Sequence, residues 1–301
     1  MSVLLAAPFA FSAPAIARHH SVAPLLLRTV QPAVHARAGP PAVASLASLA
    51  AGVGPLVGVP TWAFDATCSV LLVIASVAWI KICNLLSGSG ITSPYISRKL
   101  VHMGSGPLFI LCWPLFSTTP SGQAAAIAVP VLSVIRLLVA GRSPDNSERG
   151  AELVRAISRT GERSEALGGP MIYTLVLLVG CAFGWRSLVS AIAVCQMAIG
   201  DGMADIIGRR FGRTKWPFAF AGEKSVEGSA AFAAFAWIAC MLMVALFHVT
   251  GLSALTMMQA AGPLLIISLS AAAIELLPLG DDNFTVPLVA AIMSICLLGG
   301  T

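Results

Sequence analysis

The chain has 301 residues, of which 57% are hydrophobic and only 10% are charged, and its formal net charge at pH 7 is +5. Soluble domains carry about 25% charged residues, so this composition excludes an ordinary soluble enzyme. The mean hydropathy of +0.88 instead predicts an integral membrane protein. Its spanning segments should be helices, because a backbone in lipid must satisfy its own hydrogen bonds.

The first 60 residues differ in character from the rest. They contain Arg18, Arg28 and Arg37, many Ala, Ser and Pro, and no acidic residue, which is typical of an organelle transit peptide. A secretory signal is an alternative, because "LLAAPFAFSAPAIA" has an apolar core, but it lacks a charged start and is broken by prolines. An untargeted tail is a third reading. We expect a transit peptide and flexible leader over residues 1–60 and one multi-span membrane domain over 61–301.

A spanning helix needs about 20 mostly apolar residues, and the membrane domain offers seven or eight such stretches. The fold class predicted is therefore an all-α polytopic bundle of about seven to eight transmembrane helices. In chain order the stretches are Ala66–Leu86, two spans within Leu100–Ile135 divided at "STTPSG", Ala166–Trp185, a span that begins at Ser187 and continues past Asp201, two spans within Ser229–Ala273 divided at "HVTGLS", and Asn283–Thr301.

The charged connections give this bundle a predicted sidedness. If the spans alternate, every basic residue of the membrane domain except Arg186 falls on one face or at a span end that opens onto it, as the positive-inside rule expects. All acidic residues after Asp65 collect on the same face. The segment 142–165 on this face predicts a short amphipathic helix on the membrane surface. A face that holds both signs of charge suits a polyanion and its metal ion.

The seven cysteines lie in apolar stretches with no CxxC pattern and no zinc spacing. Small buried thiols are therefore expected rather than a disulfide framework or a metal knuckle.

The densest charge follows the fifth span, in "AIGDGMADIIGRRFGRTKWPF". Asp201 and Asp205 project from one side of a helix, where two carboxylates could hold Mg²⁺. Three glycines flank them and would let a phosphate chain approach the backbone: Gly200, Gly202 and Gly208. Four basic residues follow: Arg209, Arg210, Arg213 and Lys215. Interfacial arginines at a helix end could explain the basic residues alone, but two carboxylates at a span end are costly unless partnered.

Two further motifs carry candidate residues. In "EKSVEGS", Lys224, Ser225 and Gly228 would place a cation and backbone N–H groups near a bound phosphate, although a capped helix start explains the same pattern. In "SRKLVHMGSG", Arg98 and His102 share a helical face. Arg98 and Lys99 could equally be topology anchors, and a lone His at a membrane boundary is more often structural.

The last connection, "ELLPLGDDNFTVP", holds an acidic cluster of Glu275, Asp281 and Asp282 beside Asn283. A solvated turn is one explanation, because Gly-Asp-Asp-Asn is good turn chemistry. A metal-binding or proton-accepting role is the other. No Walker A, GxGxxG, HExxH or GxSxG pattern occurs in the chain, so a phosphate site here would not be a P-loop.

Together, "SRKLVHMGSGP", "GDGMADIIGRRFGRTKWPF", "EKSVEGS" and "DDNFTVPL" resemble the phytol kinase branch of the polyprenol kinase family, which is related to the phosphatidate cytidylyltransferases. The resemblance runs from Ser97 to Pro287. It implies a CTP-dependent kinase in a plastid membrane that phosphorylates an isoprenoid alcohol, of which phytol is the first candidate. The product would feed tocopherol synthesis. By resemblance, Asp201 and Asp205 match the metal and nucleotide motif. Residues of the phosphate-holding part are Arg209, Arg210, Lys224, Ser225 and Gly228, and those of the acidic turn are Asp281, Asp282 and Asn283.

The expected partners are an isoprenoid alcohol, CTP with Mg²⁺, and the lipid bilayer, with no nucleic acid. The active face would be the side rich in Lys and Arg, which is the stroma in a chloroplast membrane. The proton of the alcohol could pass to Asp281, Asp282 or Glu275, and His102 is a less favoured candidate.

Three alternatives stay open. A farnesol or geranylgeraniol kinase would differ only in its alcohol. A cytidylyltransferase would use the same pocket but form a CDP-lipid. A polytopic transporter would normally place charge at the bilayer midplane or show repeated halves, and the sequence has no internal repeat.

Overall fold

The computed structural model describes residues 58–144, 147–148 and 150–299, all within one compact unit. The leader predicted over residues 1–60 lies almost entirely outside these residues. The described part is helical and contains no strand, apart from an isolated antiparallel bridge between Lys215 and Ser225. The predicted all-α class is therefore confirmed.

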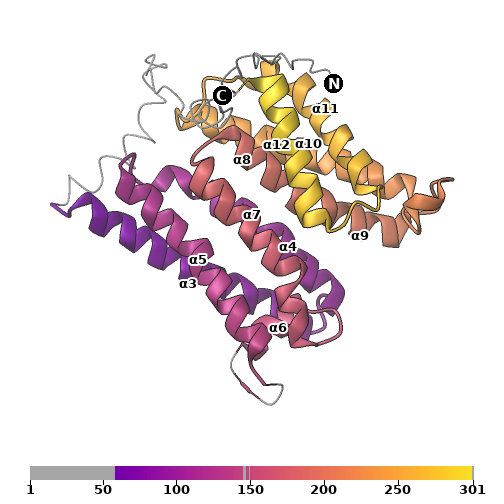
Figure 1. Cartoon of the computed structure of the whole chain (residues 1–301), viewed down its shortest axis with the longest axis horizontal. Coiled ribbons are helices and arrows are strands. Elements are labelled where there is room, and N and C mark those ends of the chain that lie inside the picture. Colours follow the sequence, from indigo (N-terminus) through magenta and orange to yellow (C-terminus); the bar gives the residue numbers. More distant parts are fainter. Residues whose placement is uncertain (1–57, 145–146, 149, 300–301) are drawn as a thin grey trace, which may run out of the picture. The chain divides into compact units, whose positions relative to one another are not determined.

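The long helices follow one another with short connections (Figure 1). In chain order they are α3 (Thr61–Gly88), α4 (Pro94–Leu111), α5 (Pro120–Arg142), α6 (Ala151–Ile157), α7 (Gly169–Phe183), α8 (Leu188–Cys195), α9 (Asp201–Phe211), α10 (Val226–Val249), α11 (Met257–Glu275) and α12 (Asp282–Leu298). Helices α3, α4, α5 and α7 pack beside one another, and α10 packs against α9 and α11, with α12 next to α11 and α8.

Six helical segments are long and apolar enough to cross a membrane, judged by length and composition. They are α3, α5, the segment Arg163–Phe183 that contains α7, the segment Leu188–Phe211 that joins α8 to α9, α10 and α11. The two other predicted spans are present as helices but are less suited to crossing. α4 carries Arg98, Lys99 and His102 in its first turns, and α12 has only 17 residues.

Local sequence signals set the helix ends. Ser93 caps α4, whose first residue is Pro94, and Ser225 caps α10 by accepting a hydrogen bond from the Gly228 N–H. Thr256 and Gln259 form a capping box at the start of α11. The predicted breaks at "STTPSG" and "HVTGLS" separate α4 from α5 and α10 from α11. Hydropathy and capping together therefore predict most of the helix boundaries.

One irregularity lies directly before the first aspartate of the charged motif. The turn Gln196–Gly200 (η3) between α8 and α9 is a π-helix, and such turns often occur at functional sites. A Cβ atom added to Gly200 would lie 2.6 Å from the ring of Phe232 on α10. This close approach of the Gly200 backbone to the Phe232 ring fixes where Asp201 emerges.

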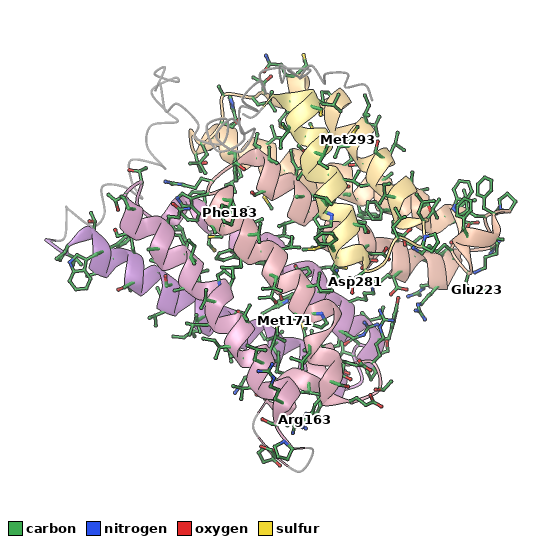
Figure 2. The ribbon with its side chains drawn as sticks, viewed as in Figure 1. Arg163, Met171, Phe183, Glu223, Asp281 and Met293 are labelled. Carbon is green, nitrogen blue, oxygen red and sulfur yellow. The ribbon has the colours of Figure 1, made fainter. Side chains whose placement is uncertain are left out.

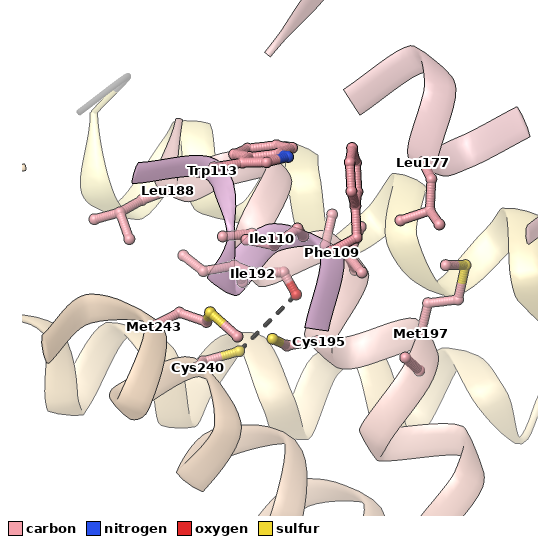
Figure 3. Packing of buried hydrophobic residues seen from close by; sticks show 14 of the residues in the cluster. Phe109, Ile110, Trp113, Leu177, Leu188, Ile192, Cys195, Met197, Cys240 and Met243 are labelled. Atoms are coloured by element: carbon pink, nitrogen blue, oxygen red, sulfur yellow. Dashed lines mark hydrogen bonds between the residues drawn. The ribbon is translucent and has the colours of Figure 1, made fainter. Parts of the chain in front are cut away.

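The main core lies between α4, α7, α8, α10, α11 and α12 (Figure 3). Trp113, Ile192, Cys195 and Met197 are buried in it, and the Cys240 Sγ lies 3.9 Å from the Ile192 carbonyl oxygen. All seven cysteines are free; four are buried, while Cys296 is exposed. The expectation of free thiols is confirmed, but full burial holds for only some of them.

The helix predicted in segment 142–165 is present as α6, but it does not simply lie on the membrane surface as expected. α6 buries Leu153, Val154 and Ala156, and the first two pack with Leu137 of α5 in one apolar cluster. Its apolar side therefore covers protein rather than only lipid. Apolar residues on one side of a helix indicate burial, but the sequence does not say whether protein or membrane buries them.

A polar cluster around Asp65 fixes the N-terminal end of α3. The Asp65 carboxylate is fully buried and accepts hydrogen bonds from the Ser117 N–H at 2.8 Å, the Ser117 hydroxyl at 2.7 Å and the Ser121 hydroxyl at 2.8 Å. These contacts tie α3 to the connection between α4 and α5.

We expect Asp65→Ala to destabilise the protein by roughly 2–3 kcal/mol, because it leaves buried donors without an acceptor. Thermal unfolding in detergent measures the change. Asp65→Asn retains an acceptor and should lose less. Equal melting of Asp65→Ala and the wild type would mean that the cluster does not hold the connection.

Candidate active site

Five helix ends bring the predicted charged residues together. The start of α4 contributes Lys99 and His102, α9 contributes Asp201 and Asp205, and the residue before the α10 cap is Lys224. The end of α11 supplies Glu275, and the start of α12 supplies Asp282. These side chains are far apart in the sequence, and the contacts below join them into one cluster.

Lys99 lies between the two aspartates of α9. Its Nζ is 3.2 Å from Asp201 Oδ2 and 2.9 Å from Asp205 Oδ2, and its side chain is only 7% exposed. Asp205 also binds Arg209 Nε at 2.6 Å. The pair predicted from sequence therefore does converge on a cation, but in this structure the cation is an ammonium group.

Lys224 forms a second arrangement of the same kind. Its Nζ lies 2.8 Å from Glu275 Oε1 and 3.7 Å from Asp282 Oδ2, and it also donates to the Glu275 carbonyl oxygen. Glu275 is buried. Because an isolated carboxylate is costly to bury, these ion pairs make it possible for several acids to share one low-dielectric site.

Three of the acids meet between the two lysines. Ligand oxygens of Asp201, Glu275 and Asp282 all lie within 4.8 Å of one another. Mg²⁺ prefers oxygen ligands at about 2.0–2.1 Å, so small rotations of these carboxylates would bring all three to one ion. The donor set fits a divalent cation, and it shares only Asp201 with the pair predicted from sequence.

His102 and Tyr173 border the cluster on the side of α4. His102 Nε2 lies 3.4 Å from Asp201 Oδ2 and 3.3 Å from the carbonyl oxygen of Met197, in the π-helical turn. The Tyr173 hydroxyl donates to the His102 carbonyl oxygen at 2.9 Å and accepts from the Gly106 N–H at 2.8 Å. These bonds fix the backbone that presents His102.

Asp281, labelled in Figure 2, directly precedes α12, and Asn283 lies in the first turn of this helix. Asp281 Oδ1 accepts hydrogen bonds from the Asn283 N–H at 2.9 Å and from the Asn283 side-chain amide at 2.8 Å. Asp281 therefore caps the helix, as turn chemistry predicts, and this places Asp282 toward Lys224. Both readings of the acidic connection are compatible with this geometry.

Two arginines near the cluster have no carboxylate within ion-pair distance among the described residues. They are Arg98 on α4 and Arg159 after α6, and their charges are close enough to repel each other. Arg98 lies 5.8 Å from the centre of the Tyr95 ring. The Asp205 carboxylate also acts on Arg98, but from beyond ion-pair distance. Both guanidinium groups therefore keep donors for a bound polyanion.

The four glycines predicted to approach phosphate lie at helix contacts in the structure. Gly200 faces Phe232, Gly202 faces Met103, and Gly208 and Gly228 face each other between α9 and α10. This geometry gives them a packing role, since a Cβ atom at Gly202 would lie 2.2 Å from the Met103 side chain. Their binding of nucleotide stays a prediction.

Three of the predicted basic residues lie away from the cluster. Arg210 stacks on Phe211, Lys215 pairs with the exposed Glu223, and Arg213 lies in the same connection before α10. Figure 2 shows Glu223 in this protruding connection, where the rings of Trp216, Phe218 and Phe220 stack. Ser225 is buried as the cap of α10.

One cavity of about 1020 Å³ joins this cluster to an apolar region. Its charged end is lined by Arg98, Lys99, His102, Arg159, Asp201, Asp205, Arg209, Lys224, Asp281, Asp282 and Asn283. Its other walls come mostly from apolar residues of α3, α4, α5 and α7, together with Arg136, Glu165 and several hydroxyl side chains. The volume is at the upper end of the roughly 300–1,000 Å³ typical of small-molecule sites.

Sequence reasoning missed the roles of Lys99 and Arg159. The sequence offers no role for Lys99 beyond that of a topology anchor, although Lys99 shares a helical face with His102 three residues later. That spacing is the signal that could have found it. Arg159 lies in a segment read as interfacial, and nothing in its local sequence distinguishes it from its charged neighbours.

Comparison with known proteins gives relatives that are named as chloroplastic phytol or farnesol kinases. The chain is 33% identical over 290 residues to "Probable phytol kinase, chloroplastic" of Triticum aestivum, covering 95% of this chain and 94% of the relative. It is 37% identical over 216 residues to "Farnesol kinase, chloroplastic" of Arabidopsis thaliana, covering 69% and 67%. It is 34% identical over 208 residues to "Phytol kinase 1, chloroplastic" of the same plant, covering 68% and 67%.

No family model matches the chain, and no solved structure matches it. The Triticum aestivum relative covers 95% of the chain and the two Arabidopsis thaliana relatives about two thirds of it, in agreement with the resemblance of the four motifs. The chain belongs to the phytol kinase branch of the polyprenol kinase family.

Proposed function

We propose that this protein is a kinase of isoprenoid alcohols in a chloroplast membrane, that phytol is its main acceptor and that CTP is its phosphoryl donor. The observation that carries the proposal is the cavity whose one end is charged and whose other end is apolar. A water-soluble nucleotide and a membrane-dissolved alcohol can meet only where both kinds of surface adjoin. The relatives are named phytol kinase and farnesol kinase, with a chloroplastic location.

The reaction needs positioning and neutralised charge more than covalent help from the protein. The hydroxyl oxygen of the alcohol attacks the γ-phosphorus, the bond between that phosphorus and the β,γ-bridging oxygen breaks, and CDP leaves. Arg98 and Arg159 would hold the phosphate chain, since neither has a carboxylate partner among the described residues. Lys99 and Lys224 hold the carboxylates of the site in place through their ion pairs.

Asp201, Glu275 and Asp282 would hold Mg²⁺, which when bound lowers the charge repulsion between the donor and the attacking oxygen. Of the groups considered as proton acceptors, Asp281 is engaged in capping α12 and Glu275 in binding Lys224. His102, Asp281 and Asp282 all line the cavity. Since Asp282 would hold Mg²⁺ and lies 3.7 Å from Lys224 Nζ, the proton of the alcohol would pass to His102. The site would face the stroma, and phytyl monophosphate would feed tocopherol synthesis.

The experiment uses membranes that contain the full chain, with phytol, Mg²⁺, and CTP or ATP labelled at the γ- or α-phosphate. We expect γ-label from CTP in a lipid monophosphate and no α-label in lipid. Transfer from ATP alone would overturn the choice of donor. α-Label in a CDP-lipid would favour the cytidylyltransferase alternative. The absence of label in any lipid would favour the alternative that the protein is a transporter.

We expect Arg159→Gln to raise the KM for the nucleotide by about tenfold, because a charge-assisted contact to phosphate is lost. Steady-state kinetics with varied CTP measure the change. Arg210→Gln is the matched comparison, since the Arg210 guanidinium lies over Phe211 at 5.5 Å and does not line the cavity. A larger effect at Arg210 than at Arg159 would instead support the phosphate site predicted from sequence.

A further inference from the structure

The apolar part of the cavity follows one face of α4 away from the charged cluster. His102, Ser105, Phe109 and Cys112 line it at successive turns. Since a helix rises 1.5 Å per residue, this face extends about 15 Å from His102 to Cys112. The groove therefore leads from the catalytic cluster toward the opposite end of α4.

Three other helices complete the groove. α3 contributes Leu72 and Trp79, α5 contributes Val129, and α7 contributes Leu177. Val129 and Leu177 belong to the buried core, so the inner wall is closed by packed protein. Leu108 on α4 also lines the cavity and is 45% exposed, so the groove opens sideways, where a chain could enter from lipid.

The hydroxyl groups on the groove wall need no ligand. Ser76, Ser105, Ser133 and Thr174 each donate to a carbonyl oxygen of their own helix. These four side chains therefore present mainly hydrocarbon surface to an occupant. The wall also carries the Arg136 guanidinium and the buried Trp79 Nε1, which has no hydrogen-bond partner among the described residues.

Close packing holds the Trp79 indole, which lines the groove. A Cβ atom added to Gly104 of α4 would lie 2.6 Å from the ring of Trp79 on α3. Only glycine permits this approach, so the Trp79 indole of α3 packs directly on the Gly104 backbone of α4. The groove then continues past it to Leu72, about two helical turns further along α3.

We propose that this groove binds the isoprenoid chain of the acceptor alcohol and that Leu72, at its distal end, limits the chain length. The inference rests on the proposed kinase function, since it places the hydroxyl end of the chain at the His102 end of the groove. Hydrocarbon walls, a sideways opening and continuity with the charged cluster all fit one occupant: an apolar chain with a single polar head.

The test compares farnesol with geranylgeraniol, which is one isoprene unit longer, and with phytol. Leu72→Trp would fill the distal end, so we expect the rate with geranylgeraniol and phytol to fall at least about tenfold relative to the rate with farnesol. Leu71→Trp is the matched control, because Leu71 is 60% exposed on the same helix and does not line the cavity. Identical chain-length profiles of the two variants would overturn the proposal.

A second measurement does not depend on kinase activity. A photoreactive analogue of the isoprenoid alcohol, incubated with the full chain in vesicles, should cross-link to peptides of α3 and α4, and excess phytol should compete. Labelling that phytol does not displace, or that falls on helices outside the groove, would overturn the groove as the chain site. If labelling is as expected but no lipid is phosphorylated, the proposed kinase function fails while the binding site stands.

Discussion

Asp201→Asn is expected to lower the rate of phosphoryl transfer by about 10³-fold while the protein stays folded. Asp201 is the acid that joins both arrangements of the site, because it contacts Lys99 and also faces Glu275 and Asp282. The substitution removes a negative charge from the three-acid set. Lys99 keeps its contact with Asp205 at 2.9 Å, so the fold retains its buried ion pair.

The measurement is kcat with saturating phytol and CTP, together with a melting curve for each variant. Glu223→Gln is the control, since it neutralises an acid of the adjoining connection that is almost fully exposed and pairs with Lys215. A loss of activity in Glu223→Gln comparable to that in Asp201→Asn would indicate a general charge effect. Unchanged activity in Asp201→Asn would place the chemistry elsewhere.

Lys99→Met is expected to destabilise the protein by about 3–5 kcal/mol, because removing one partner of a buried ion pair leaves uncompensated charge behind. Two carboxylates, those of Asp201 and Asp205, would then share a site with no ammonium group between them. Unfolding in detergent, monitored with temperature, measures the loss.

The matched control for this lysine is Lys215→Met. Lys215 also forms an ion pair, but its side chain is 49% exposed, and such exposed pairs contribute about 0–1 kcal/mol. We therefore expect Lys215→Met to melt close to the wild type. Similar melting temperatures for the two variants would show that Lys99 does not stabilise the acids of the site.

The helices were largely predictable because a lipid environment constrains the backbone so strongly. Long uncharged runs predicted α3, α5, α7, α10 and α11, and the polar breaks between them were correct. The π-helical turn before Asp201 was not predictable, since it depends on the contact of Gly200 with Phe232 of another helix. The packing of α6 on protein was missed for the same reason.

The candidate site was predictable in its composition but not in its pairing. Charged groups at span ends are costly unless partnered, and this argument pointed to Asp201 and Asp205. The motifs "EKSVEGS" and "ELLPLGDDNFTVP" pointed to Lys224, Glu275 and Asp282. Which acid faces which lysine depends on how five helices pack, and no local spacing encodes it. The position of Asp205 four residues after Asp201 suggested a shared metal, whereas the structure places Lys99 between them.

Mn²⁺ binding, followed by electron paramagnetic resonance of the purified full chain, most directly tests whether the three acids form the metal site at the centre of this proposal. Mn²⁺ prefers the same oxygen ligands as Mg²⁺. We predict that Glu275→Gln weakens binding strongly and that Asp205→Asn leaves it nearly unchanged, because only Glu275 belongs to the three-acid set. Loss of binding in Asp205→Asn with retention in Glu275→Gln would contradict this site and favour the pair of Asp201 and Asp205.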